Sequence, residues 1–268
     1  DDMLPATLHI MPISTRPFFP GQAQPVTVNM EQWGDTLREV GRSGHRLLGV
    51  AFIDGKEAGE AAVADFPVTG CVVRLHSVPN AQDSAGENAP GQFLVQGIKR
   101  FRVVRWLSEE APFLAQVEYP RSQGQRDSDE VKAYAMALIK EIKELLPLNP
   151  LYSEELKQYL SHFSPNEPSF LADFCAALTT ASGTQLQQVL ETLPLITRME
   201  LVLNLLRKER EVAELQTKIT GQVNQQVSEQ QREFFLREQL KVIQKELGIS
   251  KDDKTVDADD FQARLEDA

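Results

Sequence analysis

The side chains that most often carry out chemistry are scattered along this chain. The two cysteines, Cys71 and Cys175, lie far apart in segments of different character, which indicates two half-buried thiols in a reducing compartment and not a disulfide. No histidine has a second ligand at helical or zinc-finger spacing; the four are His9, His45, His76 and His162. A phosphate-binding loop, a GxSxG turn and a CxxC pair are also missing from the sequence. The sequence therefore predicts no catalytic residue, no cofactor site and no metal site.

A basic cluster comes closest to a binding signal, and its members are Lys99, Arg100, Arg102 and Arg105. On a strand, Arg100 and Arg102 would share one face, and Phe101 would lie on the other. The cluster would either contact nucleic acid or form the charged outer face of a half-buried strand. The net charge of the chain is −11, whereas phosphate binding needs a basic surface. We therefore expect the second alternative and do not expect nucleic acid as a partner.

Two pairs of adjacent phenylalanines are candidates for protein contact. Phe18 and Phe19 lie between prolines in RPFFPG, where both rings fill a β-rich core or form an apolar patch open to partners. Phe234 and Phe235 lie in QQREFFLREQLKVIQKELG, a charged, glutamine-rich segment. Adjacent helix positions point about 100° apart, so one of these two rings leaves the main apolar row. We expect that ring to touch a neighbouring chain or a protein substrate. The candidate contact residues are Phe234, Phe235, Leu236, Leu240, Phe18 and Phe19.

Residues 1–122 are predicted to form a compact, antiparallel β-barrel. Segments such as QPVTVNM and GQFLVQGIKRFRVVRWL are rich in β-branched residues and are bounded by clusters of Gly, Pro and Asn. One short helix is expected over residues 31–44. A polar loop is expected over residues 78–92.

Residues 123–193 are predicted to form a helical bundle. Ser128 is a good N-cap for a helix that Pro147 closes. Short connections between the helices that follow favour an antiparallel arrangement. Further helix starts are predicted at Ser153, at Ser164 with Glu167, and at Thr184 with Gln187.

Residues 194–247 are predicted to form one long helix, because Gly221 is the only glycine and no proline follows Pro194. At 1.5 Å per residue such a helix is about 75–80 Å long, more than the 30–35 Å or so across a typical domain. Part of it should therefore project. A bend or break over residues 221–228 is the alternative, because a mid-helix glycine costs about 1 kcal/mol. The apolar spacing averages slightly above 3.6 residues and predicts only a thin coiled-coil seam. Residues 248–268 read as an acidic linker.

No run of about 18 apolar residues is present, so no membrane span is expected. The N-terminus, DDMLPATLHIMPIS, has neither the basic start nor the apolar core of a signal peptide. A bacterial cytoplasm is favoured over a mitochondrial matrix, because no transit peptide is visible.

Three segments resemble those of the ATP-dependent Lon proteases. QREFFLREQLKVIQKELG is similar to the segment just before the ATPase module of that family. LPLITRMELVLNLLRKEREVAELQTKI resembles its run into a long helix, and LHIMPISTRPFFPGQAQPVTV resembles its opening strand and turn. FLVQGIKRFRV resembles a later Gly-x-x-Arg strand through Gly97 and Arg100. The resemblance covers essentially the whole chain, with departures at ISTR and over residues 51–66.

This resemblance implies an α+β fold, in which a PUA-like β domain and a helical bundle are followed by a long helix leading to a hexameric ring. The end of the chain would begin the ATPase module. The nucleotide-binding motifs, the Ser–Lys proteolytic dyad, ATP and Mg²⁺ are expected beyond residue 268, so this region would not itself be an enzyme.

The implied function is recognition and delivery of unfolded or damaged proteins in protein quality control, together with support of hexamer assembly. Self-association would run through the long helix. The alternative is a purely structural oligomerisation scaffold without direct substrate contact.

Overall fold

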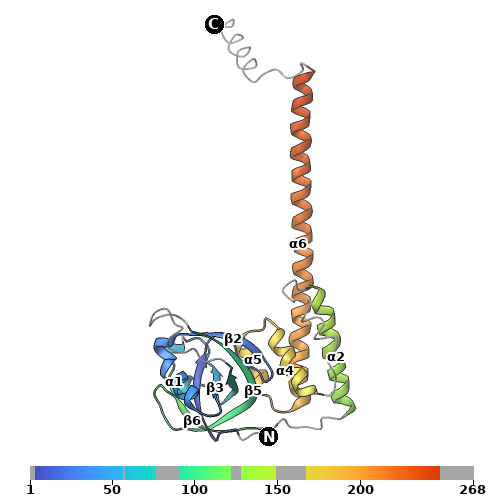
Figure 1. The fold of residues 1–268 in the computed structure, drawn as a ribbon. Helices are drawn as coiled ribbons and strands as arrows, with labels where there is room; N and C mark the ends of the chain where they lie inside the picture. Colours follow the sequence, from blue (N-terminus) through green and yellow to red (C-terminus); the bar gives the residue numbers. More distant parts are fainter. Residues whose placement is uncertain (1–3, 57, 77–90, 122–127, 149–166, 248–268) are drawn as a thin grey trace, which may run out of the picture. The chain divides into compact units, whose positions relative to one another are not determined.

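The structure is a computed structural model that describes residues 4–56, 58–76, 91–121, 128–148 and 167–247 (Figure 1). The chain divides into two compact units, Asp1–Ala213 and Glu214–Ala268. We call them the first and the second unit and describe each by itself.

The first unit contains one six-stranded sheet with the strand order β2-β5-β4-β3-β1-β6. The strands are β1 (Thr7–Ile13), β2 (Ala23–Val28), β3 (Leu47–Phe52), β4 (Thr69–Leu75), β5 (Gly91–Trp106) and β6 (Leu114–Glu118). β5 is long enough to pair with β2 and β4 through its first part and with β6 through its last residues. The sheet therefore curls back towards its own edge (Figure 1).

The prediction of an all-antiparallel barrel is wrong in strand direction, because β1 and β3 run parallel, with Ile10 opposite Gly49. Between these two strands the chain passes through β2 and the helix α1 (Met30–Arg42). A crossover of this length lets the second strand return in the same direction, which a tight hairpin cannot do. The result is a curved, mixed sheet. Two single turns, η1 (Ala58–Glu60) and η2 (Val63–Asp65), precede β4.

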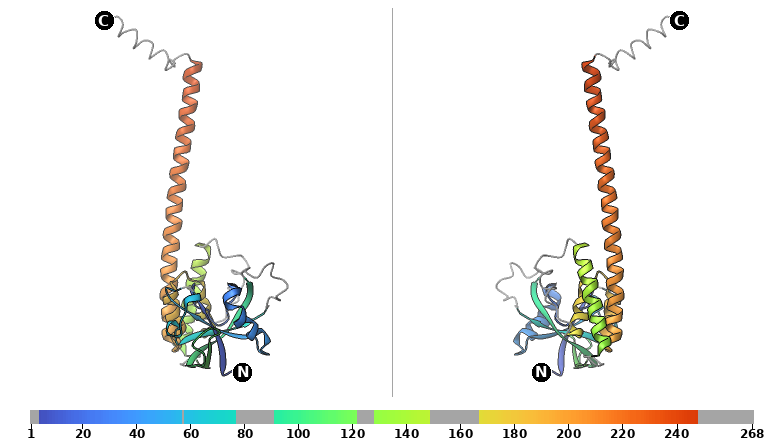
Figure 2. Two further views of the ribbon diagram at one scale, coloured as in Figure 1. Left: turned by 90° about the vertical axis from the view of Figure 1, so that its left-hand side faces the viewer. Right: turned by 90° about the vertical axis from the view of Figure 1, so that its right-hand side faces the viewer.

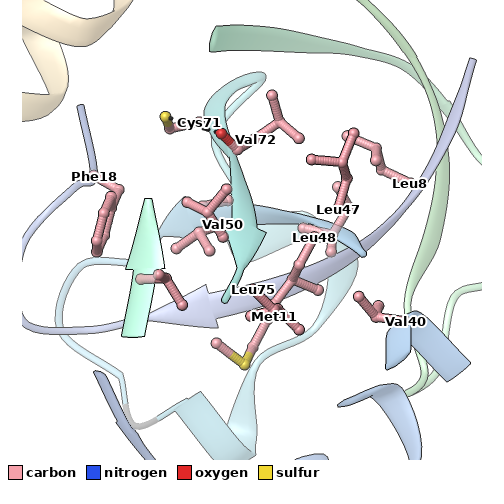
Figure 3. Packing of buried hydrophobic residues seen from close by; sticks show 14 of the residues in the cluster. Leu8, Met11, Phe18, Val40, Leu47, Leu48, Val50, Cys71, Val72 and Leu75 are labelled. Carbon is pink, nitrogen blue, oxygen red and sulfur yellow. Dashed lines mark hydrogen bonds between the residues drawn. The ribbon is translucent and has the colours of Figure 1, made fainter. Parts of the chain in front are cut away.

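The core of the sheet is formed by apolar side chains from the strands and from α1. Figure 3 shows Met11 of β1, Leu48 of β3 and Leu75 of β4 packed close together. All three are at most 5% exposed. Burying a side chain of this size contributes about 1.5–3 kcal/mol, so this layer is a main source of the stability of the first unit.

Helices pack together in the rest of the first unit: α2 (Asp129–Leu145) with the turn η3 (Leu146–Leu148), α4 (Pro168–Leu178), α5 (Gly183–Glu191) and the start of α6 (Leu195–Glu246). Figures 1 and 2 show α2 and α4 beside the first turns of α6. Their facing side chains form a second hydrophobic core, which includes Leu138, Ala172 and Met199. Residues 149–166, where a helix from Ser153 was predicted, lie outside the described residues.

Ser128 caps α2 as predicted, since its hydroxyl oxygen accepts a hydrogen bond from the N–H of Val131 at 3.2 Å. The caps predicted for the two later helices, Ser164 and Thr184, are wrong. α4 begins after Glu167, whose side chain makes no capping bond. α5 is capped by Ser182, which accepts from the N–H of Gln185 at 3.3 Å. Ser182 and Gln185 lie two residues before the predicted pair, Thr184 and Gln187, and both pairs have the Ser/Thr-x-x-Gln spacing. Spacing alone therefore could not show which pair caps the helix.

Specific contacts join the sheet to the helices, although the sequence predicted two separate domains there. The guanidinium of Arg16 donates to the carbonyls of Ala177 and Thr179 at 3.1 and 3.0 Å, at the end of α4. The side-chain amide of Gln187 on α5 donates to the carbonyl of Thr69 on β4 at 2.9 Å. These bonds satisfy backbone groups at the ends of elements, and they help to make the sheet and the helices one compact unit.

α6 runs through Gly221 as one helix from Leu195 to Glu246. The break that the sequence left open over residues 221–228 is therefore not present. Residues up to Ala213 belong to the first unit and the rest to the second. The predicted projection of the helix concerns the placement of the two units and stays a prediction. No helix in the described ranges combines the length and the apolar character that a membrane span needs.

Candidate functional site

The four candidate residues on α6 are all exposed within this chain. Phe234 is 65% exposed and Phe235 is 68% exposed. Leu236 and Leu240 are 56% and 55% exposed. Soluble proteins normally cover clustered large apolar side chains. These four are therefore among the uncovered apolar side chains of the described part of the second unit.

The exposed apolar residues of the second unit fall into three rows along α6, at about 100° of rotation per residue. The first row consists of Leu215, Ile219, Val223, Val227 and Phe234. The second consists of Leu236, Leu240, Ile243 and Leu247. The third consists of Phe235 and Val242. After Phe234 the second and third rows continue, whereas the side of the first row carries Arg237, Lys241 and Lys245.

Ion pairs on the same helix help it to remain folded while exposed. Arg237 lies 2.7 Å from Glu233, and Lys241 lies 3.0 Å from Glu238. Such pairs contribute about 0.2–0.5 kcal/mol each to an isolated helix. Such pairs therefore help this part of α6 to stay helical along its apolar rows.

Phe18 and Phe19 are not available for contact, because they are only 1% and 0% exposed. Their prediction as surface contact residues is wrong for this structure. The alternative, in which both rings fill the β core, is right for Phe18 alone, because Phe19 belongs to the helical core. Successive side chains of an extended segment point to opposite sides, so one ring could enter each core.

The basic cluster on β5 contains a buried ion pair. Two guanidinium nitrogens of Arg100 donate to the two carboxylate oxygens of Asp173 on α4, both at 2.6 Å, and its Nε donates to the carbonyl of Leu190 at 2.8 Å. The side chains of Arg100 and Asp173 are 6% and 2% exposed. A bidentate pair of this kind is specific for arginine, and it fixes β5 against α4 and α5.

A second arginine lies beside the same carboxylate. Nε of Arg198 on α6 is 3.6 Å from Asp173, and its Nη2 donates to the hydroxyl of Ser169 at 2.7 Å. Burial lowers the pKa of Arg198 to about 10, although the charge of Asp173 opposes this shift. The Asp173 carboxylate therefore lies beside two guanidinium groups, those of Arg100 and Arg198.

Neither alternative for the basic cluster holds at Arg100, which is buried and paired, and so lies neither on an outer face nor open to nucleic acid. Arg102 and Arg105 are exposed, and Arg105 donates to the side chain of Gln116 at 2.8 Å. The sequence did contain a signal for the ion pair, namely Asp173 as the one charge in the apolar helix PSFLADFCAAL. A lone charge in such a helix normally has a buried partner.

The cysteines are free and buried. Burial raises the pKa of the Cys71 thiol to about 12 and also raises that of Cys175. Such thiols are poor nucleophiles near neutral pH. Among the described residues, no group of three His, Cys, Asp or Glu side chains is placed to hold a metal ion.

A curled, mixed sheet fixed to helices by a buried ion pair, followed by a long helix with apolar rows, defines an α+β fold. The fold is similar to two solved structures. One is the N-terminal domain of a Lon protease from the Mycobacterium avium complex, with a TM-score of 0.57 and 18% identity over 75% of this chain and 98% of that one. The other is a Lon N-terminal domain protein from Xanthomonas campestris, with a TM-score of 0.50 and 18% identity over 74% and 97% of the two chains.

The chain belongs to the family of ATP-dependent protease La (LON) substrate-binding domains, whose family model matches residues 7–208. The resemblance seen in the sequence is thereby confirmed. The chain is 44% identical over 262 residues to Lon protease 2 of Hydrogenovibrio crunogenus and 42% identical over 270 residues to Lon protease of Magnetococcus marinus. These matches cover 98% and 99% of this chain but 29% and 33% of the relatives. The chain therefore spans about a third of their length.

Proposed function

We propose that this chain recognises unfolded or damaged proteins for an ATP-dependent Lon protease of the bacterial cytoplasm and delivers them to it without catalysis of its own. The bacterial sources of the relatives support this compartment. Proteolysis, with ATP, Mg²⁺ and a Ser–Lys dyad, is assigned in this proposal to the part of the relatives that the chain does not span.

The exposed aromatic pair on α6 is the observation that carries the proposal. An unfolded protein differs from its native form chiefly in the apolar side chains that it exposes. Phe234 and Phe235 offer apolar surface on two sides of the helix. Each ring that is buried at a contact contributes about 1.5–3 kcal/mol, and such contacts do not depend on a particular partner sequence. This suits a protein that must bind many damaged substrates.

Assembly is the second candidate role of the same helix, and it is supported by the number of apolar rows. One extended substrate segment would cover one side of α6, whereas the exposed apolar side chains around residues 234–247 point to more than one side. Neighbouring copies of the helix would cover the others. We propose that these contacts support the hexamer of the full-length protein and coexist with substrate binding. A scaffold that assembles without touching substrates is the competing interpretation.

The test is binding of this chain to one labelled protein, offered in its native form and in a permanently unfolded form. The Phe234→Asp/Phe235→Asp double variant is compared with Gln230→Asp/Gln231→Asp, which adds the same charge to the same helix without removing a ring. The mass of every species is measured in parallel. Selective capture of the unfolded form, lost only in the phenylalanine variant at unchanged mass, would support recognition at these rings.

The opposite outcomes are equally informative. No capture of the unfolded form by the unaltered chain would overturn the proposed recognition. A mass that falls in the phenylalanine variant alone, with capture unchanged, would assign the rings to assembly only.

A further inference from the structure

A groove of about 340 Å³ lies in the first unit between the end of β1, most of β2 and the start of α1. It is lined by residues 11–15 and 24–29, with Gln32, Trp33 and Ala58. None of the described residues that line it is charged. The chain also carries no charge from residue 17 to residue 30, although a quarter of all its residues are charged. The volume is near the lower end of the range of ligand pockets, about 300–1,000 Å³.

A proline, Pro12, lies on the edge of β1 that borders this groove. The N–H of Val117 donates to the carbonyl of Ala6, and the N–H of Ile10 donates to the carbonyl of Phe113, both at 2.9 Å. These bonds show that the backbone N–H and C=O groups of the even-numbered residues of β1 face β6. The direction of the backbone groups alternates along a strand, so the backbone nitrogen of Pro12 lies on the same side of β1. The β1–β6 pairing ends at His9. Pro12 therefore lies beyond the paired part, at the edge that borders the groove.

The edge of β2 has the same feature. The N–H of Gly97 donates to the carbonyl of Gln22 at 2.8 Å. By the same alternation, the backbone groups of Gln24 and Val26 face β5, and the backbone nitrogen of Pro25 faces away from it. β2 is first in the strand order, with no described strand on its other side. Proline has no N–H to offer to a further strand. Proline at an open edge is a common means of preventing strand addition.

We propose that this groove is a second contact site for unfolded protein, which binds uncharged apolar side chains and does not take up the substrate as an added β-strand. The inference rests on the proposed function and names a site and a selection rule for it. The occupant is a short, uncharged, apolar stretch of an unfolded chain, of the kind that lies in the core of a folded protein.

The chemistry of the lining supports this occupant. Trp33, Met11 and Val28 form a nearly buried apolar floor, at 3%, 5% and 5% exposure. Neutral amides from Gln24 and Gln32 lie around it. A charged substrate side chain would lose water there without gaining an opposite charge, which is costly. An apolar side chain would lose only unfavourable hydration.

The experiment uses a labelled seven-residue peptide of Leu, Val and Phe with a soluble tag, and the same peptide with alternate backbone nitrogens methylated. The groove variant is Gln24→Glu/Gln32→Glu, in which both side chains keep their shape. The carboxylate introduced at position 24 would still accept the hydrogen bond that Gln22 now donates to Gln24 at 2.9 Å. The control is Gln92→Glu/Gln188→Glu, which adds the same charge at exposed positions that do not line the groove. Urea unfolding checks that all variants remain folded.

We expect the groove variant to bind the peptide at least about tenfold more weakly than the control, a change of about 1.4 kcal/mol. We expect methylation to change the affinity of the unaltered chain less than about threefold, because side chains and not backbone N–H groups make the contact. Equal affinity of the groove variant and the control would overturn the site. A loss above about tenfold on methylation would indicate strand addition and would overturn the selection rule.

The permanently unfolded test protein is measured in the same series. If the unaltered chain captures it while the groove variant and the control bind the peptide equally, the groove inference fails and the proposed function stands. If the unaltered chain captures neither, both fail.

Discussion

Phe18 and Phe19 are consecutive residues whose rings lie in two different hydrophobic cores. Phe18 packs with the strands and α1, and Phe19 packs with the helices. The backbone directly after Phe19 passes close to Gly97, where an added Cβ would collide with the carbonyl oxygen of Phe19. Through this dipeptide the chain is anchored in both cores at one point. The sheet and the helices should consequently unfold together.

Phe18→Ala and Phe19→Ala are each expected to lower the free energy of unfolding by about 3–5 kcal/mol, the usual cost of removing a buried aromatic ring. The double variant measures the coupling of the two cores at this dipeptide, because the effects of substitutions at neighbouring residues need not add. Urea unfolding followed by circular dichroism measures both values. Phe235→Ala is the control and should change stability by less than about 0.5 kcal/mol. A small effect of either buried substitution would contradict the two-core arrangement.

Asp173→Asn is expected to destabilise the first unit by about 3–5 kcal/mol, because it leaves two buried guanidinium groups without their carboxylate. Asp129→Asn, at a fully exposed position near Lys132, should cost less than about 1 kcal/mol. Urea unfolding of both variants at neutral pH provides the comparison. Similar costs for the two substitutions would show that the Asp173 carboxylate is not needed for stability.

A double replacement distinguishes loss of the ion pair from an uncompensated charge. Arg100→Met/Asp173→Leu removes both charges of the bidentate pair and fills the space with apolar side chains. It should be less destabilising than Asp173→Asn alone, since apolar replacement of a buried pair is often neutral. Arg198 stays charged beside the replaced carboxylate, so a double variant at least as unstable as Asp173→Asn would mean that the contact of Asp173 with Arg198, or the geometry of the pair, matters more than the charge of Arg100.

Local patterns predicted many of the elements, because their causes lie within a few residues. Ser128 precedes its helix directly, and β5 reads as a strand over its whole length. Non-local features were beyond such patterns. The parallel pairing of β1 with β3 depends on how the chain crosses between them. The partner of Arg100 is 73 positions away, so neither residue alone reveals whether it is exposed or buried.

The candidate site was predictable to the same extent. Phe234 and Phe235 lie on a helix, and the positions of their neighbours in the three rows follow from helical periodicity. Phe18 and Phe19 have no such local determinant, because their burial depends on a sheet and a bundle formed by distant segments. The groove beside β2 needs two strand edges to face each other, and no local pattern encodes that.

Gly21→Ala is expected to lower the free energy of unfolding by more than about 2 kcal/mol, because two costs combine. Gly21 has a φ of +82°, where a Cβ costs about 1–2 kcal/mol, and the added Cβ would also collide with the ring of Phe170. Gly55→Ala is the matched control, with a φ of +71° and no atom within 4 Å of the added Cβ. Thermal or urea unfolding gives the difference, which measures the overpacking against Phe170. Equal losses would mean that the ring moves aside at no cost.

Cys71 and Cys175 are expected to resist thiol reagents at pH 8 in the folded chain and to react at once in urea. Burial raises the pKa of Cys71 to about 12, from an ordinary value of 9.0, so the reactive thiolate is scarce until the protein unfolds.

The raised pKa of Cys71 also makes the stability of the fold depend on pH. Its contribution is fully present below pH 9 and is lost as the pH rises towards 12, because the unfolded thiol ionises first. The rate of labelling at pH 8 and the urea midpoint at pH 7, 9 and 10 check both statements. Rapid labelling of the folded chain would show that these thiols are open to solvent.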